Sequence, residues 1–254
     1  MRITIILAIL AFSYLILDPC NLVYAQTASS SGLIDLDSLG SLDQAGAVEI
    51  GESKIAPNSP FYFLKAIREK IENILASTPQ SKVSLQLELA QRRLRESKSL
   101  VRDQKQDLLP STLERYKLSL DDARNLAASN SLLGIQVGEV VSRHFDVLQR
   151  MYDSVGNPRA KQAIRAAIEK AQDENQHILD SLDLTSQQQL IRKIALRQAL
   201  ACQFLQRESS SSALNGTERQ FLAHEVESCK EKVNTVLKDE LMDVIQKRSS
   251  EMKK

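Results

Sequence analysis

The residues best suited to metal chemistry are Glu174 and His177, which are three positions apart in the sequence Glu-Asn-Gln-His. On a helix this spacing puts a carboxylate and an imidazole on one face, as in ferritin-like di-iron sites. Such a site needs a second Glu-x-x-His pair, and neither His144 nor His224 has a glutamate three residues before it. We therefore expect a solvated helical face here, and we predict no metal, cofactor or catalytic residue for the chain.

Two of the three cysteines could form a disulfide. Cys20 lies in an N-terminal segment that we expect to be removed, which leaves Cys202 and Cys229. An even pair in an exported chain indicates a disulfide. Closing a loop of this length would stabilise the fold by roughly 3 to 4 kcal/mol on the chain-entropy model. Two buried free thiols are the alternative.

A basic run between positions 92 and 105 could contact phosphate, and it consists of Arg92, Arg93, Arg95, Lys98, Arg102 and Lys105. Acidic residues interleave with it at Glu88, Glu96, Asp103 and Asp107. We expect an ion-paired helical face in which each pair contributes little. No aromatic residues interleave to stack on single-stranded nucleic acid, so we predict neither a nucleic-acid partner nor a small-molecule substrate.

The composition is that of a helical protein. Eight Gly, six Pro and no Trp accompany abundant Leu, Ala, Gln, Glu, Lys and Arg, which favours helix over strand. The 33 basic and 32 acidic residues nearly cancel, so no overall field attracts nucleic acid or an acidic membrane surface. We expect an all-α fold.

The N-terminal residues 1–25 have the pattern of a signal peptide. An apolar run covers 3–17, Asp18-Pro19 breaks it, and small side chains precede a cleavage site near Ala25. A membrane-spanning helix needs about 20 apolar residues, so we expect cleavage and a periplasmic or extracellular protein. The alternative is an uncleaved anchor, the one case in which we expect membrane contact. Residues 26–56 are rich in Ser, Gly and acidic side chains and are expected to form a flexible linker.

The first helix is expected to begin with Ser59 as N-cap and Pro60 at its first position. Apolar residues then recur at spacings of three and four, which predicts an inward stripe formed by Leu64, Ile67, Ile71, Ile74 and Leu75. On this interpretation the charged residues face water, namely Lys65, Arg68, Glu69 and Glu72.

Six further helices follow from periodicity and start signals. Thr78-Pro79 begins the second, and Ser111 with Glu114 caps the third. The fourth covers about 132–155, and the fifth follows Asn157-Pro158 to about Leu182. Thr185 and Thr217 are expected to cap the sixth and seventh helices. The seventh helix is expected to continue toward Lys254. About seven amphipathic helices would form an elongated bundle of antiparallel hairpins. A hairpin module would cover 57–130, and 131–254 would either continue it or form a second domain.

The helix register bears on the disulfide. If the sixth helix stopped at Arg207, an axial offset of roughly 10 Å would separate the cysteines, more than a disulfide usually spans. We therefore expect this helix to continue to about Ala213, so that Asn215-Gly216 makes the turn.

Residues 55–71 and 82–97 resemble a bacterial family known only as domain of unknown function 5667. The first block matches a Pro-x-x-Pro-aromatic-Tyr-x-Leu-Lys-x-x-x-Glu pattern through Pro57, Pro60, Phe61, Tyr62, Leu64, Lys65 and Glu69. The second matches through Leu85, Leu87, Leu89, Ala90, Arg93 and Leu94, whereas Gln91 departs from the expected acidic residue. The resemblance covers about 55–130. It implies an exported helical module of the bacterial cell envelope and supplies no activity.

A shorter likeness lies at Leu184-Thr185-Ser-Gln-Gln188, which is similar to the Leu-Thr-x-x-Gln motif of small periplasmic chaperones of the Spy type. We expect a non-enzymatic helical binding or scaffolding protein outside the cytoplasmic membrane, with another helical envelope protein as partner. The alternative is a periplasmic chaperone that binds unfolded clients on a helical face.

Overall fold

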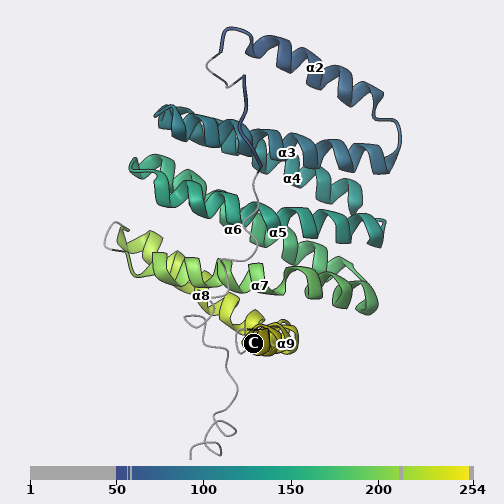
Figure 1. The fold of residues 1–254 in the computed structure, drawn as a ribbon, viewed down its shortest axis with the longest axis vertical. Coiled ribbons are helices and arrows are strands. Elements are labelled where there is room, and N and C mark those ends of the chain that lie inside the picture. The colour runs from purple at the N-terminus through teal and green to yellow at the C-terminus, as the bar shows by residue number, and fades with distance from the viewer. Residues whose placement is uncertain (1–49, 56, 58, 212–213, 252–254) are drawn as a thin grey trace, which may run out of the picture. The chain divides into compact units, whose positions relative to one another are not determined.

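The computed structural model describes residues 50–55, 57, 59–211 and 214–251. Within these ranges every regular element is a helix, which confirms the all-α prediction (Figure 1). The α-helices are α2 (Tyr62–Leu75), α3 (Pro79–Arg102), α4 (Leu109–Ala127), α5 (Ser131–Ser154), α6 (Pro158–Ser181), α7 (Leu184–Ser209), α8 (Gly216–Thr235) and α9 (Lys238–Glu251), and a short 3-10 helix covers Gln106–Leu108.

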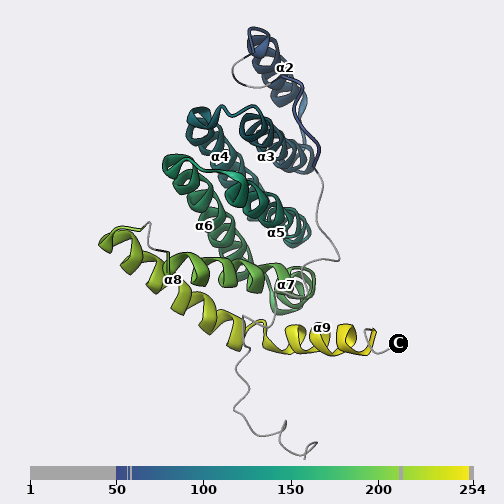
Figure 2. The same cartoon turned by 60° about the vertical axis from the view of Figure 1, so that its left-hand side comes forward.

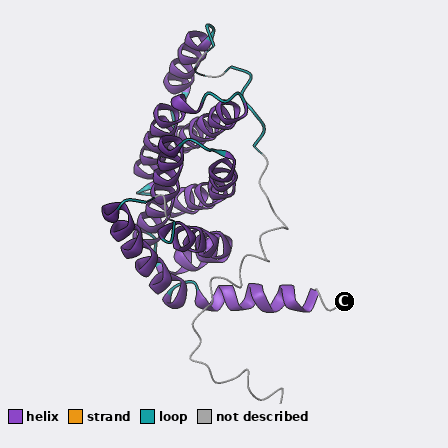
Figure 3. Ribbon diagram, turned by 90° about the vertical axis from the view of Figure 1, so that its left-hand side faces the viewer, coloured by secondary structure: helices purple, strands orange, loops and turns teal. Residues whose placement is uncertain are grey.

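Successive helices pair as hairpins that stack on one another. α3 packs on α4, α5 on α6 and α7 on α8, and neighbouring hairpins meet through α3 with α5, α4 with α6 and α5 with α7 (Figure 2). Figure 3 shows the same stack of helices, with no strand among the described residues. The described residues on either side of position 130 are therefore not separated by a gap in packing, and all described residues belong to a single compact unit. α2 packs on α3 at one end of this series (Figure 1).

The core lies between the helix layers and is mainly aliphatic. Its largest fully buried side chains are Tyr116, Phe204, Leu94, Leu100, Leu109, Leu113, Leu120, Leu148, Ile164, Ile168 and Leu190. α5 and α7 approach closely where Gly138 meets Leu190, because a Cβ built on this glycine would lie 2.8 Å from Cδ2 of Leu190. The inward stripes predicted for the sixth and seventh helices are confirmed at Ile191, Ile194, Leu222 and Val226.

Four predicted helix caps were wrong. Phe61, not Ser59, occupies the N-cap position of α2, and α4 begins at Leu109 without a side-chain cap, so that Ser111 is already helical. Asp183 caps α7 by accepting a hydrogen bond from the backbone of Ser186 at 3.0 Å. Asn215 caps α8 in a capping box with Glu218. At both α7 and α8 an Asx residue two positions before the predicted threonine cap takes its place, since a carboxylate or amide oxygen accepts from the N3 amide at least as well as a threonine hydroxyl. Thr78 does cap α3, as predicted.

The described residues contain eight α-helices, one more than the predicted seven, and the additional helix lies at the C-terminal end. α8 ends at Thr235 and α9 begins at Lys238, so the seventh helix does not run on toward Lys254. Leu237 at the junction is buried. Burying this side chain provides a packing reason for the chain to bend here rather than continue straight.

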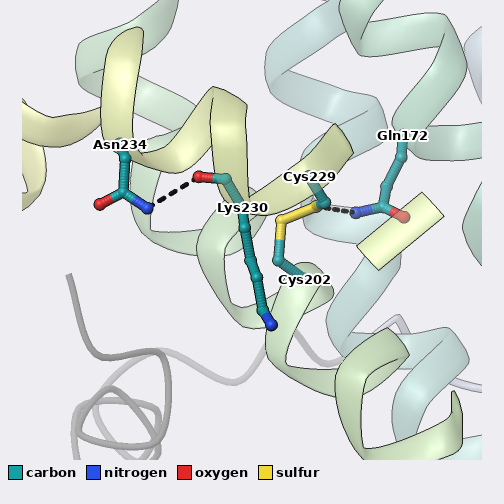
Figure 4. The surroundings of a disulfide bond; sticks show 5 residues. All are labelled: Gln172, Cys202, Cys229, Lys230 and Asn234. Carbon is teal, nitrogen blue, oxygen red and sulfur yellow. Dashed lines mark hydrogen bonds between the residues drawn. A yellow bond between two sulfur atoms is a disulfide. The ribbon is translucent and has the colours of Figure 1, made fainter. Parts of the chain in front are cut away.

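The geometry of Cys202 and Cys229 fits a disulfide, with Cα atoms 5.7 Å apart (Figure 4). The helix register that we expected was wrong, because α7 ends at Ser209 and α8 starts at Gly216. With this register the start of α8 lies about 9 Å beyond the end of α7 along the hairpin axis. Gln172 of α6 donates a hydrogen bond to Sγ of Cys229 at 3.6 Å (Figure 4).

The predicted signal peptide, with its cleavage site near Ala25, and most of the predicted linker lie outside the described residues. The end of that linker packs on α3. Ile50 is buried, the backbone N–H of Ser53 donates to Oγ of Ser99 at 3.0 Å, and Glu52 pairs with Arg102. None of the described helices combines the length and apolarity needed to cross a membrane.

Candidate binding site at helix α2

Helix α2 faces the opposite way from the prediction. Both acidic residues of α2, together with Tyr62 and Lys65, lie toward the bundle, whereas its large aliphatic residues lie away from it. Lys65 and Glu69, which were expected in water, have side chains only 14 % and 13 % exposed, whereas Ile71 and Ile74 are 52 % and 80 % exposed. No residue of α2 is fully buried.

A network of charged and phenolic side chains holds α2 on the bundle, and we call it the polar seam. It consists of Tyr62, Lys65, Glu69 and Glu72 of α2, Arg92, Arg93 and Glu96 of α3, and Arg115 of α4. Six of these eight residues are the acidic and basic residues of α2 and α3 that were expected on solvated helix faces. The ion pairing predicted for this run is found between Arg93 and Glu96, but both residues are buried rather than solvated.

Glu96 is the centre of the seam and is completely buried. Its Oε1 accepts from Lys65 at 2.5 Å and from Arg93 at 2.7 Å, and its Oε2 accepts from the hydroxyl of Tyr62 at 3.3 Å. Arg93 also reaches Glu69. Burial lowers the pKa of Arg93, but the carboxylates of Glu96 and Glu69 outweigh it, so that the pKa is raised overall.

The C-terminal part of the seam is a forked pair between Arg92 and Glu72. Two guanidinium nitrogens reach the two carboxylate oxygens at 2.5 and 3.3 Å, a geometry that fixes orientation as well as distance. Hydrogen bonding from Arg92 lowers the pKa of Glu72. Arg68 adds a contact to the same carboxylate at 2.8 Å.

Tyr62 connects α2 to two other helices. Its hydroxyl accepts from Arg93 at 3.0 Å and from Arg115 of α4, and the guanidinium of Arg115 also lies 5.3 Å from the centroid of the ring. Burial and the nearby carboxylate of Glu96 raise the pKa of this phenol. Tyr62 is thus an anchor, whereas the neighbouring Phe61 and Phe63 are 60 % and 58 % exposed.

The outer face of α2, together with the residue that precedes the helix, carries a group of exposed apolar side chains that we call the exposed stripe. Its members are between 50 % and 80 % exposed, and they are Phe61, Phe63, Leu64, Ile67, Ile71, Ile74 and Leu75. Scattered exposed apolar residues are ordinary, but a contiguous run on one helix marks an interaction site. The stripe is therefore the strongest candidate for a binding surface in the described part of the chain.

Basic residues border the exposed stripe. Arg68 has a side chain 70 % exposed, and Lys70 is exposed. Glu69 and Glu72 are turned into the polar seam. Beside the helix, a cavity of about 410 Å³ is lined by Leu64 of the stripe together with Lys54, Lys65, Arg68, Arg92 and Arg95, against the two acidic residues Glu52 and Glu88. The outer side of α2 therefore combines apolar surface with positive charge.

The reason for this orientation lies in α3. Its apolar residues, such as Leu87 and Leu94, are buried in the hairpin core, so the side left for α2 carries Arg92, Arg93 and Glu96. An apolar face laid on these charges would desolvate them without compensation, at several kcal/mol per ion. The complementary charges of α2 avoid that penalty. A sequence signal did exist, because Tyr62, Lys65 and Glu69 share one helix face and match the acid and base on α3.

The other candidate residues are not brought together as a site. The solvated face predicted for Glu174 and His177 is wrong at Glu174, which is fully buried and pairs with Arg124 of α4 at 3.0 Å and Lys170 at 2.7 Å, whereas His177 is exposed. Sequence reasoning missed the buried pair of Tyr116 and His144, whose hydroxyl and Nδ1 are 3.3 Å apart. Burial lowers the pKa of His144 to about 3, so this imidazole is neutral.

The family model for a domain of unknown function, DUF5667, matches residues 54–193, more than half of the chain. The chain is therefore a member of the DUF5667 family, and the match extends well beyond the 55–130 expected from its motifs. It includes the polar seam and the exposed stripe. No curated protein and no solved structure matches the chain.

Proposed function

We propose that this protein is an exported, non-enzymatic binding or scaffolding protein of the bacterial cell envelope, and that α2 is its binding element. The observation that carries the proposal is the orientation of α2: a buried set of ion pairs fixes one face, and the opposite face presents seven exposed apolar side chains. A helix held in this way is already folded before its partner arrives, which lowers the entropy lost on binding.

The compartment rests on the sequence of residues 1–25 and on family membership. The proposed disulfide between Cys202 and Cys229 agrees with an oxidising location, where such bonds persist, and the Cα separation of 5.7 Å is within the usual range.

A photo-reactive amino acid at position 71, compared with one at position 184, tests the proposal in cells that produce the protein. Ile71 lies in the exposed stripe, and Leu184 is an exposed apolar residue of α7. We expect the cell-envelope fraction to contain a cross-linked product, whether with protein or with lipid, for position 71 alone. Equal products from both positions, no product, or a protein confined to the cytosol would contradict the proposal.

A chaperone role is the second candidate, and the exposed stripe is the observation that favours it. A chaperone of this kind would suppress the aggregation of a denatured client at stoichiometric amounts, and replacing Ile71 with glutamate would abolish the effect. Unchanged aggregation of the client would remove this candidate and leave the binding role standing.

A further inference from the structure

We infer that the exposed stripe and its basic border bind the surface of an anionic phospholipid membrane, with α2 lying in the plane of the interface. This inference names the partner of the binding element proposed above and therefore rests on that proposal. It also differs from the expectation that membrane contact requires an uncleaved N-terminal segment, because the contact belongs to α2.

The first argument is the distribution of charge around the stripe. A helix that lies on a membrane has an apolar face bordered by lysine and arginine. On α2 the exposed cations are Arg68 and Lys70, and Lys70 forms no ion pair or hydrogen bond with any described residue. Glu69 and Glu72 are occupied in the polar seam, so no carboxylate of α2 would face the lipid headgroups.

The second argument is the cavity beside the stripe. Leu64 belongs to both, and the cavity lining adds the exposed Lys54 to Arg68, whereas Arg92 and Arg95 of the lining are already paired with carboxylates. A phosphate at this position would lie next to cations while its acyl chains met the stripe. Each lysine or arginine near an anionic bilayer is worth about 1 kcal/mol.

The third argument concerns the size of α2. Fourteen residues give a helix about 21 Å long, too short to cross roughly 30 Å of hydrocarbon, so the helix would lie flat. Its strip of about 21 Å by 10 Å is also small for a second copy of the chain, since a standard protein interface covers about 800 Å² on each partner. Pairing two copies would bring Arg68 and Lys70 near their own counterparts.

The absence of tryptophan from the sequence permits a direct test. The variant Phe63→Trp puts one indole in the stripe, and Phe221→Trp puts one on α8, where the native residue is exposed to a similar degree, 54 % against 58 %. We expect vesicles of phosphatidylglycerol to shift the Phe63→Trp emission to the blue and to leave Phe221→Trp unchanged. Vesicles of phosphatidylcholine should leave both unchanged.

Two pairs of variants in the Phe63→Trp background measure the contributions of the stripe and its border. Ile74→Glu should weaken vesicle binding by about tenfold or more, whereas Leu184→Glu, at a site exposed to the same degree (79 % against 80 %), should not. Lys70→Gln should weaken binding to phosphatidylglycerol roughly fivefold, and Lys238→Gln at the start of α9 should change it little. The N-terminal segment is the same in every variant, so it cannot produce these differences.

Several results would overturn the inference. The first three are no blue shift of the tryptophan emission with phosphatidylglycerol, an equal blue shift with both lipids, and vesicle binding without a blue shift at position 63. The fourth is a blue shift without lipid that grows with protein concentration, which would assign the stripe to a second copy of the chain. Cross-linking of position 71 to an envelope protein alone, with no vesicle binding, would assign it to an acidic partner helix. That last result would leave the proposed function intact, whereas the absence of any cross-link would contradict the function itself.

Discussion

Glu96 is the residue on which the docking of α2 depends most, because three groups from two helices converge on its buried carboxylate. A buried ion pair is weak evidence of net stability when compared with an apolar replacement, but removal of one partner leaves an uncompensated charge. The seam therefore specifies how α2 is oriented, whatever its net contribution to stability.

Glu96→Gln tests this role. Loss of the negative charge leaves Lys65 and Arg93 without their common partner, and we expect the free energy of unfolding to fall by about 3 kcal/mol or α2 to detach. Urea unfolding measures the first effect, and hydrogen exchange of the α2 amides measures the second. Glu88→Gln on the same helix, where the side chain is 38 % exposed, should change stability by less than about 0.5 kcal/mol. Equal effects of the two substitutions would contradict the central position of Glu96.

Glu169 is expected to make stability depend on pH. Burial, and then the carboxylates of Glu225 and Asp173, raise its pKa to about 7 against the opposing effect of Arg165 and Lys117. Because the folded pKa exceeds the ordinary value of 4.5, the unfolded chain ionises first, and this group destabilises the fold progressively as pH rises from about 4.5 to 7.

Glu169→Gln removes that effect. At pH 8 we expect the variant to be more stable than the parent by about 1 to 2 kcal/mol, allowing for partial solvent exposure. At pH 4 both side chains are neutral and the difference should vanish. Urea unfolding at the two pH values gives the comparison, and an equal gain at both would show that charge is not the cause.

At the scale of the element, the structure and the sequence-based expectation differ in which residue caps α7. Asp183→Ala removes an acceptor for the backbone N–H and side chain of Ser186 and should lower the free energy of unfolding by about 1 kcal/mol. Thr185→Ala, at the predicted cap, should have a much smaller effect. Thermal unfolding of the two variants decides between them, and a larger loss for Thr185→Ala would favour the predicted cap.

Apolar periodicity predicted where most helices lie, but it did not decide which side of α2 faces the bundle. Leu64, Ile67, Ile71 and Ile74 correctly indicate an amphipathic helix. A stripe becomes internal only if the neighbouring element offers apolar surface, and α3 offers charge there instead. The boundary at Leu237 was missed for a similar reason, since the burial of that residue depends on tertiary contacts. The sequence therefore identified the residues of the candidate site as a motif, but it did not predict that their apolar side chains are exposed.

At the scale of the whole molecule, the pair Cys202 and Cys229 connects α7 to α8 over 27 positions of sequence. The double variant Cys202→Ser with Cys229→Ser should lower the free energy of unfolding by roughly 3 kcal/mol relative to the oxidised parent. Under reducing conditions this difference should largely disappear. A peptide map of the exported protein without reductant should contain the linked peptides, and two free thiols would contradict the bond.

The orientation of α2 is the central claim, and cysteine accessibility tests it most directly. Single variants Ile67→Cys and Ile71→Cys, in the exported protein with its native cysteines paired and no lipid present, should react with a water-soluble maleimide nearly as fast as Leu184→Cys. Leu94→Cys, at a fully buried site, should react only on unfolding. Protection of positions 67 and 71 to the same degree as position 94 would place the stripe inside the bundle and contradict this account.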